Sequence, residues 1–177
     1  VGVDQGIANG VAEGRPIQFV DVFPQTPDRK VHLFPTELEQ ASDATLYHYR
    51  ESVTNPDYPL TLISPATEKT INSTLGELRT HAARLQMHPN DAETRGLTNG
   101  DTVRVFNKLG EVHCPMTCNR DMRRGIVGLP KGLWRMSTLN GATVNALVSD
   151  NLTDLGGGAV FNDTQVEVAR IVTASLS

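Results

Sequence analysis

Hydroxyl and amide side chains are concentrated in one segment of the sequence, Leu62–Leu78 (LISPATEKTINSTLGEL). The segment opens as an apolar strand and continues into serine, threonine and asparagine. Such side chains, together with backbone N–H groups, can hold a polyol or a phosphate without an excess of lysine and arginine. Composition alone favours a solvated loop here, and binding of a polar ligand is the alternative.

A second polar segment, Gly132–Asp163, combines carboxylates with amides. Guanine presents N1–H and N2–H donors beside an O6 acceptor, so an aspartate can accept both donors while an asparagine serves O6 or the edge of a pterin. Capping of a helix or turn is the competing role for such an aspartate. The triple glycine at 156–158 does not predict a phosphate loop, because no Lys-Ser or Lys-Thr pair follows it.

The elements that must position these segments are organised around Leu85–Cys118. A short apolar run leads through a polar turn into one or two helical turns, Asp91–Arg95. Asn90 or Asp91 is placed to cap the exposed N–H groups at the start of these turns. Gly96 is placed as the left-handed residue that ends them.

A β-hairpin is predicted next, after a tight turn at Asn99-Gly100, where both residues tolerate positive φ. The strand Asp101–Asn107 turns over and returns as Glu111–Asn119. The returning strand alternates, which is typical of a half-buried antiparallel strand in a small barrel or sandwich. One face carries Val112, Cys114, Met116 and Cys118, and the other carries His113, Pro115 and Thr117.

The run HPNDAETRGLTNGDTVRVFNKLGEVHCPMTC resembles the C-terminal, molybdopterin-dinucleotide-binding domain of the molybdenum and tungsten oxidoreductases, the superfamily of formate dehydrogenases, nitrate reductases and dimethyl sulfoxide reductases. The resemblance implies a mainly β fold, a six-stranded double-psi β-barrel of the aspartate-decarboxylase-like type, with short helices and an irregular N-terminal extension. The positions that fit the family pattern are His88, Pro89, Asp91, Ala92, Gly96, Leu97, Gly100, Asp101, Val103, Val105, Asn107 and Gly110.

The resemblance also implies a cofactor site, because members of this family contact their pterin with the loop after the first barrel strand. By that match the candidates to touch the pterin or its pyrophosphate are Ser64, Thr67, Lys69, Asn72 and Ser73. The "T-G-R" that commonly opens this loop is replaced by Ser64-Pro65-Ala66, which removes an arginine that some relatives offer.

The second polar segment matches a further family pattern through Gly132, Trp134, Asn145, Leu147 and Asp150. Asn145 and Asp150 are therefore candidates for the pterin or guanine edge, with a cap as the alternative role of Asp150. Trp134 is a candidate to stack on the cofactor, and packing in the core or at an interface is its alternative role.

Residues 1–58 differ from the rest, since prolines and glycines interrupt short strand-like runs at Ile17–Phe23 and Lys30–Phe34. A helical turn is expected over Thr36–Ala41. FPQTPDRKVHLFP is similar to the segment by which these oxidoreductases pass from their catalytic domains into the C-terminal one. We therefore expect residues 1–58 to be a linker or the tail of a preceding domain, and residues 59–177 to be the barrel.

The composition and charge of the chain limit the classes of function that it can have. The 177 residues hold one domain with an extension, and 15 glycines and 10 prolines suit a turn-rich β protein. A net charge of −4 without a basic stripe argues against a nucleic-acid partner, and no apolar run reaches the roughly 20 residues of a membrane helix. The two cysteines are expected to pack as small hydrophobes rather than to bind metal.

The chain begins at Val1 and is expected to be a piece of a longer protein. A cytoplasmic location is favoured, and an export signal upstream would make it periplasmic. The metal-ligating residue and the iron–sulfur cysteines of the family lie in other domains, so no catalytic or metal-binding residue is predicted and this segment alone is expected to be inactive.

The favoured function is to bind and cap bis-molybdopterin guanine dinucleotide within an oxidoreductase catalytic subunit. The expected partners are the remaining domains of that subunit and an iron–sulfur electron-transfer subunit. The alternative is a double-psi barrel that binds proteins or peptides without a cofactor. An aspartic protease is disfavoured, because Asp101-Thr102-Val103 lacks the glycine of the protease motif.

Overall fold

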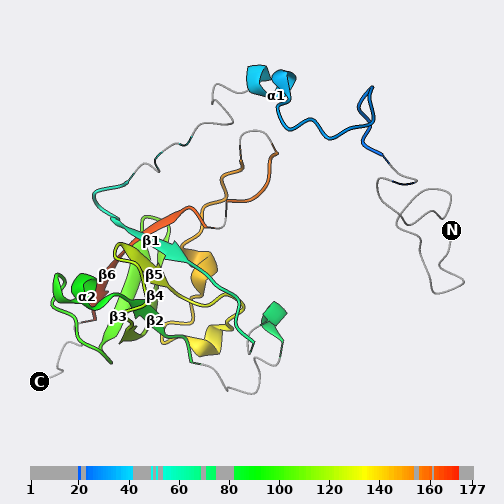
Figure 1. Cartoon of the computed structure of the whole chain (residues 1–177). Coiled ribbons are helices and arrows are strands. Elements are labelled where there is room, and N and C mark those ends of the chain that lie inside the picture. Colours follow the sequence, from blue (N-terminus) through cyan, green and yellow to red (C-terminus); the bar gives the residue numbers. More distant parts are fainter. Residues whose placement is uncertain are drawn as a thin grey trace, which may run out of the picture. The chain divides into compact units, whose positions relative to one another are not determined.

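The computed structural model describes residues 20, 23–41, 49, 51, 54–68, 71–74, 82–153, 156–160 and 162–171. The chain divides into two compact units, Val1–His48 and Tyr49–Ser177. Six strands close into a barrel in the second unit (Figure 1). They are β1 (Leu60–Ile63), β2 (Leu85–Met87), β3 (Thr102–Asn107), β4 (Gly110–Cys118), β5 (Ile126–Gly128) and β6 (Thr164–Arg170).

The barrel order is β1-β5-β2-β4-β3-β6. The pairs β1–β5 and β2–β4 are parallel, and the other four pairs are antiparallel. Exchanging β1 with β4, β2 with β5 and β3 with β6 reproduces the same closed order, so the barrel has an internal two-fold pattern. The predicted six-stranded double-psi barrel is confirmed.

Side chains at alternate positions of each strand fill the barrel, because successive side chains of a strand point to opposite faces. Burying one such aliphatic side chain contributes roughly 1.5–3 kcal/mol. In β4 the predicted inward face is confirmed, with Cys118 only half-buried at the end of the strand. The largest fully buried side chains are Leu62, Leu85, Met87, Met116, Leu129, Leu147, Val103, Val105, Val112, Val127, Val166 and Val168.

The helix α2 (Pro89–Glu93) begins earlier than predicted, and its cap is a different residue. His88 is the N-cap, because its Nδ1 accepts a hydrogen bond from the N–H of Asn90 at 3.1 Å. Pro89 at the first helical position fits, since its missing N–H would have no helical partner. Gly96 adopts φ +64° beyond the helix, as predicted.

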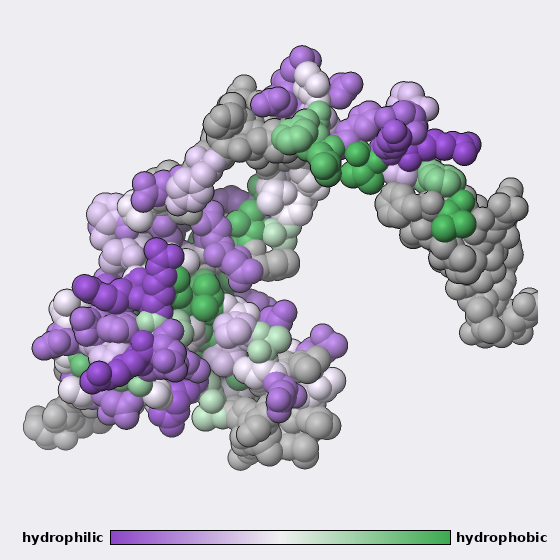
Figure 2. Space-filling view, viewed as in Figure 1, coloured by the Kyte–Doolittle hydropathy of each residue, from purple (hydrophilic) through white to green (hydrophobic). Residues whose placement is uncertain are grey.

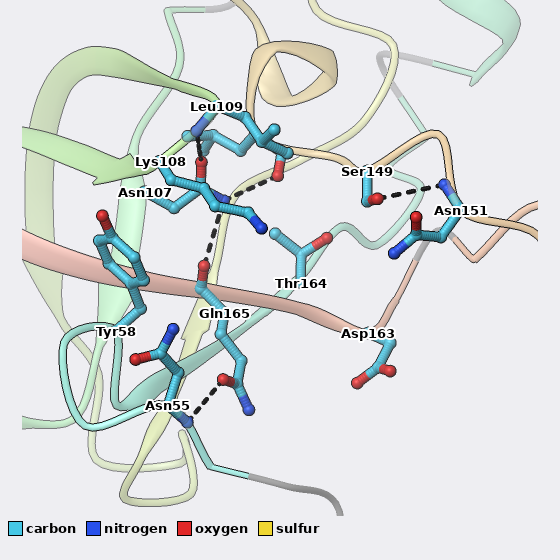
Figure 3. A pocket seen from close by; sticks show the side chains of 11 residues that line it. Asn55, Tyr58, Asn107, Lys108, Leu109, Ser149, Asn151, Asp163, Thr164 and Gln165 are labelled. Carbon is cyan, nitrogen blue, oxygen red and sulfur yellow. Dashed lines mark hydrogen bonds between the residues drawn. The ribbon is translucent and has the colours of Figure 1, made fainter.

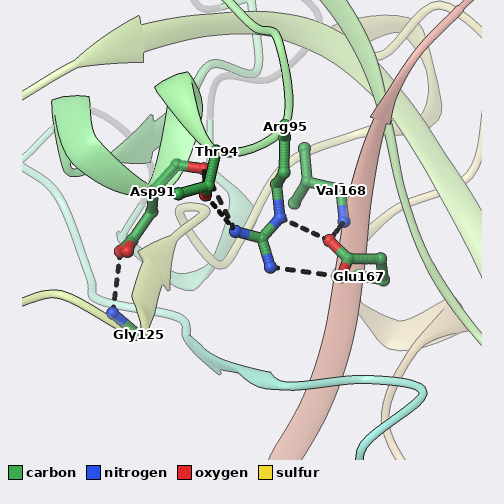
Figure 4. Close-up of polar contacts among 6 residues, drawn as sticks. All are labelled: Asp91, Thr94, Arg95, Gly125, Glu167 and Val168. Carbon is green, nitrogen blue, oxygen red and sulfur yellow. Dashed lines mark hydrogen bonds and ion pairs between the residues drawn. The ribbon is translucent and has the colours of Figure 1, made fainter.

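Asp91, predicted as a cap, instead joins α2 to the barrel (Figure 4). Its Oδ2 accepts a hydrogen bond of 2.7 Å from the N–H of Gly125, just before β5. Arg95 forms a two-pronged ion pair with Glu167 of β6, at 2.6 and 3.1 Å. Arg95 also donates to the carbonyl of Asp91 at 3.0 Å, so one cluster ties α2 and the residues just after it to the barrel.

Replacing Arg95 with methionine is expected to lower the free energy of unfolding by roughly 1–3 kcal/mol. The side chains of Arg95 and Glu167 are only 18% and 25% exposed, so water screens the pair weakly. Arg124→Met is the matched control, because Arg124 is 68% exposed and lies 4.0 Å from Asp91. If the two changes lower the free energy of unfolding equally, the Arg95–Glu167 ion pair does not stabilise the barrel as stated.

The first unit contains the helix α1 (Thr36–Ala41), with the bounds that the sequence predicts. The run Lys30–Phe34 was predicted as a strand, and this is wrong: it forms bends. The turn before it explains why. Asp28 accepts a hydrogen bond from the N–H of Lys30 at 3.1 Å and lies 2.9 Å from His32, which favours a turn over extended backbone. Ile17–Phe23 falls almost wholly outside the described residues.

Two residues upstream of the predicted domain boundary at residue 58/59 contact the barrel. The N–H of Asn55 donates to Gln165 of β6 at 2.8 Å. The ring of Tyr58 meets that of Phe106 edge-on, with 6.3 Å between centroids. The boundary and the linker role of residues 1–58 stay predictions.

The face of the barrel unit seen in Figure 2 is mostly hydrophilic, with small hydrophobic areas. None of the helices in the described part of the chain has the length and apolar content that crossing a lipid bilayer requires.

Candidate functional site

The parallel pairing of β1 and β5 brings the two polar segments of the sequence together. Ile63 lies opposite Gly128, so the chain leaves both strands at the same end of the barrel. The N–H of Leu129 donates to the carbonyl of Ile63 at 3.1 Å, and the N–H of Lys131 donates to that of Pro65 at 3.2 Å. The loops that follow meet at a cavity of about 70 Å³, lined by Ser73, Pro130, Lys131, Gly132, Leu133, Thr143, Val144 and Asn145.

A side-chain hydrogen bond also joins the two loops at this end of the barrel. The indole Nε1–H of Trp134 donates to the carbonyl of Ser73 at 2.7 Å. Asn72 and Ser73 have φ of 53° and 58°, a conformation that two successive non-glycine residues rarely adopt. Since such backbone is costly unless its surroundings hold it, the bond from Trp134 helps to keep this turn in place.

The loop from Trp134 to Asn145 is a folded segment rather than an open one. It contains the 3-10 turns η5 (Arg135–Ser137) and η6 (Val144–Ala146). Thr138 Oγ1 donates to the carbonyl of Ala142 at 2.7 Å, and Arg135 Nε donates to that of Gly141 at 3.1 Å. The carbonyl of Ser137 accepts from the N–H of Ala83, just before β2, at 2.7 Å.

The cavity offers hydrogen-bonding groups and one cation. Ser73, Thr143 and Asn145 contribute hydroxyl and amide groups, and among the described lining residues only Lys131 is charged. Such a set can bind the edge of a polar ring or a phosphate oxygen. No group of three or more His, Cys, Asp or Glu side chains placed to hold a metal ion occurs among the residues that the structure describes.

A larger cavity of about 230 Å³ lies beside the turn between β3 and β4 (Figure 3). The side-chain Nδ2 of Asn107 donates to the carbonyls of Leu147 and Gln165, at 2.8 and 3.1 Å. Asn107 thereby ties this turn to β6 and to the segment after η6. The remaining lining side chains are mainly amides and hydroxyls, including Asn55, Tyr58, Ser149, Asn151 and Thr164.

The structure brings three of the predicted cofactor-binding residues together. Ser73 and Asn145 line the smaller cavity, and Trp134 bonds to Ser73. Trp134 is 39% exposed, so it is not a core residue. Stacking of its ring on a cofactor stays a prediction.

The other predicted site residues do not line that cavity. Ser64 and Thr67 are half-buried after β1, and Asn72 is exposed. Asp150 is exposed and lines neither cavity, although its neighbours Ser149 and Asn151 line the larger one. Lys69 lies outside the described residues. The roles of all these residues stay predictions.

Two lining residues of the smaller cavity, Lys131 and Thr143, were missed by sequence reasoning. Lys131 lies three residues after the end of β5, and the parallel pairing of β5 with β1 is what brings it to the site. A lysine beside a short apolar strand carries no such signal unless that pairing is known.

Burial raises the pKa of the Cys114 thiol from 9.0 to about 11. The folded chain therefore keeps this proton at pH values where the unfolded chain has lost it. Stability from this group is complete below pH 9 and is lost as the pH rises through 11, by roughly 3 kcal/mol in all. Urea unfolding at pH 8 and pH 10.5 tests this, and Cys114→Ala should show a smaller difference between the two pH values. An equal difference in both proteins would contradict it.

Comparison with known families decides the identity of the barrel. Residues 60–165 match the family model described as "Molydopterin dinucleotide binding domain". The chain belongs to this family of molybdopterin dinucleotide-binding domains. The resemblance noted in the sequence is confirmed, and the match covers β1 to β5 completely and the first two residues of β6.

The curated relatives are catalytic proteins of greater length. The probable oxidoreductase YoaE of Bacillus subtilis is 28% identical over 151 residues, which cover 82% of this chain and 22% of that protein. The dimethyl sulfoxide reductase DmsA of Escherichia coli is 32% identical over 125 residues, which cover 66% of this chain and 15% of that protein. The chain thus spans about a fifth or less of each.

Among solved structures, acetylene hydratase from Pelobacter acetylenicus superposes with a TM-score of 0.66. The two sequences are 19% identical, and the superposition covers 82% of this chain and 24% of that one. At this level of identity the likeness concerns the fold alone.

The smaller cavity fits one part of a pterin dinucleotide. Its hydroxyl, amide and lysine groups match the donors and acceptors of a pterin edge or a phosphate. Its volume of about 70 Å³ corresponds to only a few water molecules, so most of a dinucleotide would lie outside it.

Proposed function

We propose that this chain is the part of a molybdenum or tungsten oxidoreductase catalytic subunit that holds and caps bis-molybdopterin guanine dinucleotide. One observation carries the proposal: the predicted residues Ser73 and Asn145, from two separate loops, line one small polar cavity, and the predicted Trp134 bonds to Ser73. The family membership gives that cavity a ligand class.

The chain's own residues would bind and orient rather than react. The amide of Asn145 and the hydroxyl of Thr143 can exchange hydrogen bonds with a ring edge, while Lys131 can neutralise a phosphate. The redox chemistry would be supplied by the metal that the cofactor carries. The remaining domains of the same subunit and an iron–sulfur electron-transfer subunit are the proposed partners.

Cofactor content tests the proposal. In an oxidoreductase subunit that carries this sequence, Asn145→Ala should weaken retention of the dinucleotide about 3- to 10-fold, the effect of losing one hydrogen bond. Oxidised pterin and GMP released from the purified subunit give the measurement. Asn151→Ala is the control, because Asn151 lines only the larger cavity. If Asn151→Ala loses the dinucleotide and Asn145→Ala retains it, the smaller cavity is not the binding site.

A further inference from the structure

Among the residues that the structure describes, no strand covers one edge of β4 along the first half of that strand. Residues 110–115 pair with β3, and β2 pairs only with residues 116–118. The N–H and carbonyl groups of Glu111 and His113 on that side therefore need another partner, since unpaired backbone groups at a sheet edge are costly when water is excluded.

Asn140 covers this edge with its side chain. Its Oδ1 accepts from the N–H of His113 and its Nδ2 donates to the carbonyl of Glu111, both at 3.0 Å. The N–H of the preceding residue, Leu139, donates to the carbonyl of His113 at 2.9 Å. One amide side chain and one backbone N–H thus bind three of these four backbone groups, as a neighbouring strand would.

The residues anchored here belong to the loop that forms the candidate cavity. Asn140 lies between Trp134, which bonds to Ser73, and Asn145, which lines the cavity. The same strand also supports the far end of the loop, because Gly110 of β4 packs against the backbone of Ala146 in η6. The first half of β4 therefore contacts this loop at two places, at Asn140 and at Ala146.

We propose that Asn140 is a positioning residue, which fixes the loop carrying Trp134 and Asn145 on the open edge of β4 so that the cavity is formed before any ligand binds. The importance of this cavity for cofactor rests on the proposed function. An asparagine suits the role because it supplies one donor and one acceptor side by side. Aspartate, when ionised, would place a second acceptor against the carbonyl of Glu111.

The single tryptophan makes the proposal measurable without cofactor. The chain has one indole N–H, and its hydrogen exchange reports whether the Trp134–Ser73 bond is open. Asn140→Ala should speed indole exchange about 10-fold or more, since two hydrogen bonds are lost. Backbone amides of Val105 and Val168, within the barrel, should exchange as in the unchanged chain.

Asn140→Asp adds a readout that general destabilisation would not reproduce. At neutral pH its carboxylate only accepts, so indole exchange should be fast. Below about pH 4 the protonated carboxyl both donates and accepts, and the exchange rate relative to the unchanged chain should fall back. Asn119→Ala is the matched control, since Asn119 bonds Gln86 and Asp121 away from the loop.

Indole exchange that is unchanged in Asn140→Ala would overturn the proposal. So would an equal acceleration at the indole and in the barrel core, because that pattern means global unfolding. The proposed function has its own separate readout, binding of a 6-carboxypterin probe by the unchanged chain. Absence of that binding would count against the cofactor assignment and would leave the exchange result for Asn140 standing.

Discussion

Replacing Gly110 with alanine is expected to lower the free energy of unfolding by roughly 1–3 kcal/mol and to displace the loop that carries Asn145. An added Cβ would lie 2.8 Å from the carbonyl oxygen of Ala146, a backbone atom that cannot simply turn away. Denaturant unfolding measures the first effect, and changes in the amide NMR signals of Thr143 and Asn145 measure the second.

Gly128→Ala is the control for this prediction. Gly128 is likewise a strand glycine, but its added Cβ would make only ordinary van der Waals contacts, with the flexible end of Met122 at 3.5 Å and with the Cβ of Gln86 at 3.8 Å. The control should change stability by under about 1 kcal/mol. If both variants lose the same stability, or if Gly110→Ala leaves the loop signals in place, then Gly110 does not support the site.

Replacing Asp150 with alanine is expected to lower the cofactor occupancy of the full-length subunit while leaving the stability of the chain unchanged. The side chain is exposed, and none of the described hydrogen bonds involves it, so its removal should not disturb the fold. A carboxylate on the guanine edge would form charge-assisted hydrogen bonds worth roughly 1.5–3 kcal/mol each.

The competing role of Asp150 predicts the reverse pattern. A capping aspartate would contribute about 1 kcal/mol to stability and nothing to occupancy. Denaturant unfolding of the chain and pterin content of the subunit together separate the two roles. If Asp150→Ala destabilises the chain and the cofactor occupancy of the subunit stays normal, Asp150 acts as a capping residue of a turn.

The hairpin of β3 and β4 and the turns before it could be predicted because their signals are local. The alternation in β4, the turn at Asn99-Gly100 and the left-handed Gly96 each lie within a few residues. The pairing of β1 with β5 could not be predicted from periodicity, because parallel partners far apart in sequence leave no short-range signal. The family resemblance supplied that part of the fold.

Predictions about α2 and the loop after β5 failed where side chains bind backbone groups. Asp91 has the sequence position of a cap, yet its carboxylate bonds to Gly125 because packing of α2 places it there. His88 caps instead through a ring nitrogen, which is not among the usual capping groups. Asn140 carries no motif at all, and only the open edge of β4 gives it a role.

Binding of the pterin dinucleotide at the cavity lined by Ser73 and Asn145 is the central claim. An NMR titration of the ¹⁵N-labelled chain with 6-carboxypterin and, separately, with GMP tests it most directly. The claim predicts that one of these probes shifts the indole N–H signal of Trp134 together with the amide signals of Ser73 and Asn145. Asn145→Ala should weaken that response. Signals that move only around Asn107 and Asn151, or none that move up to the solubility limit of both probes, would contradict the claim.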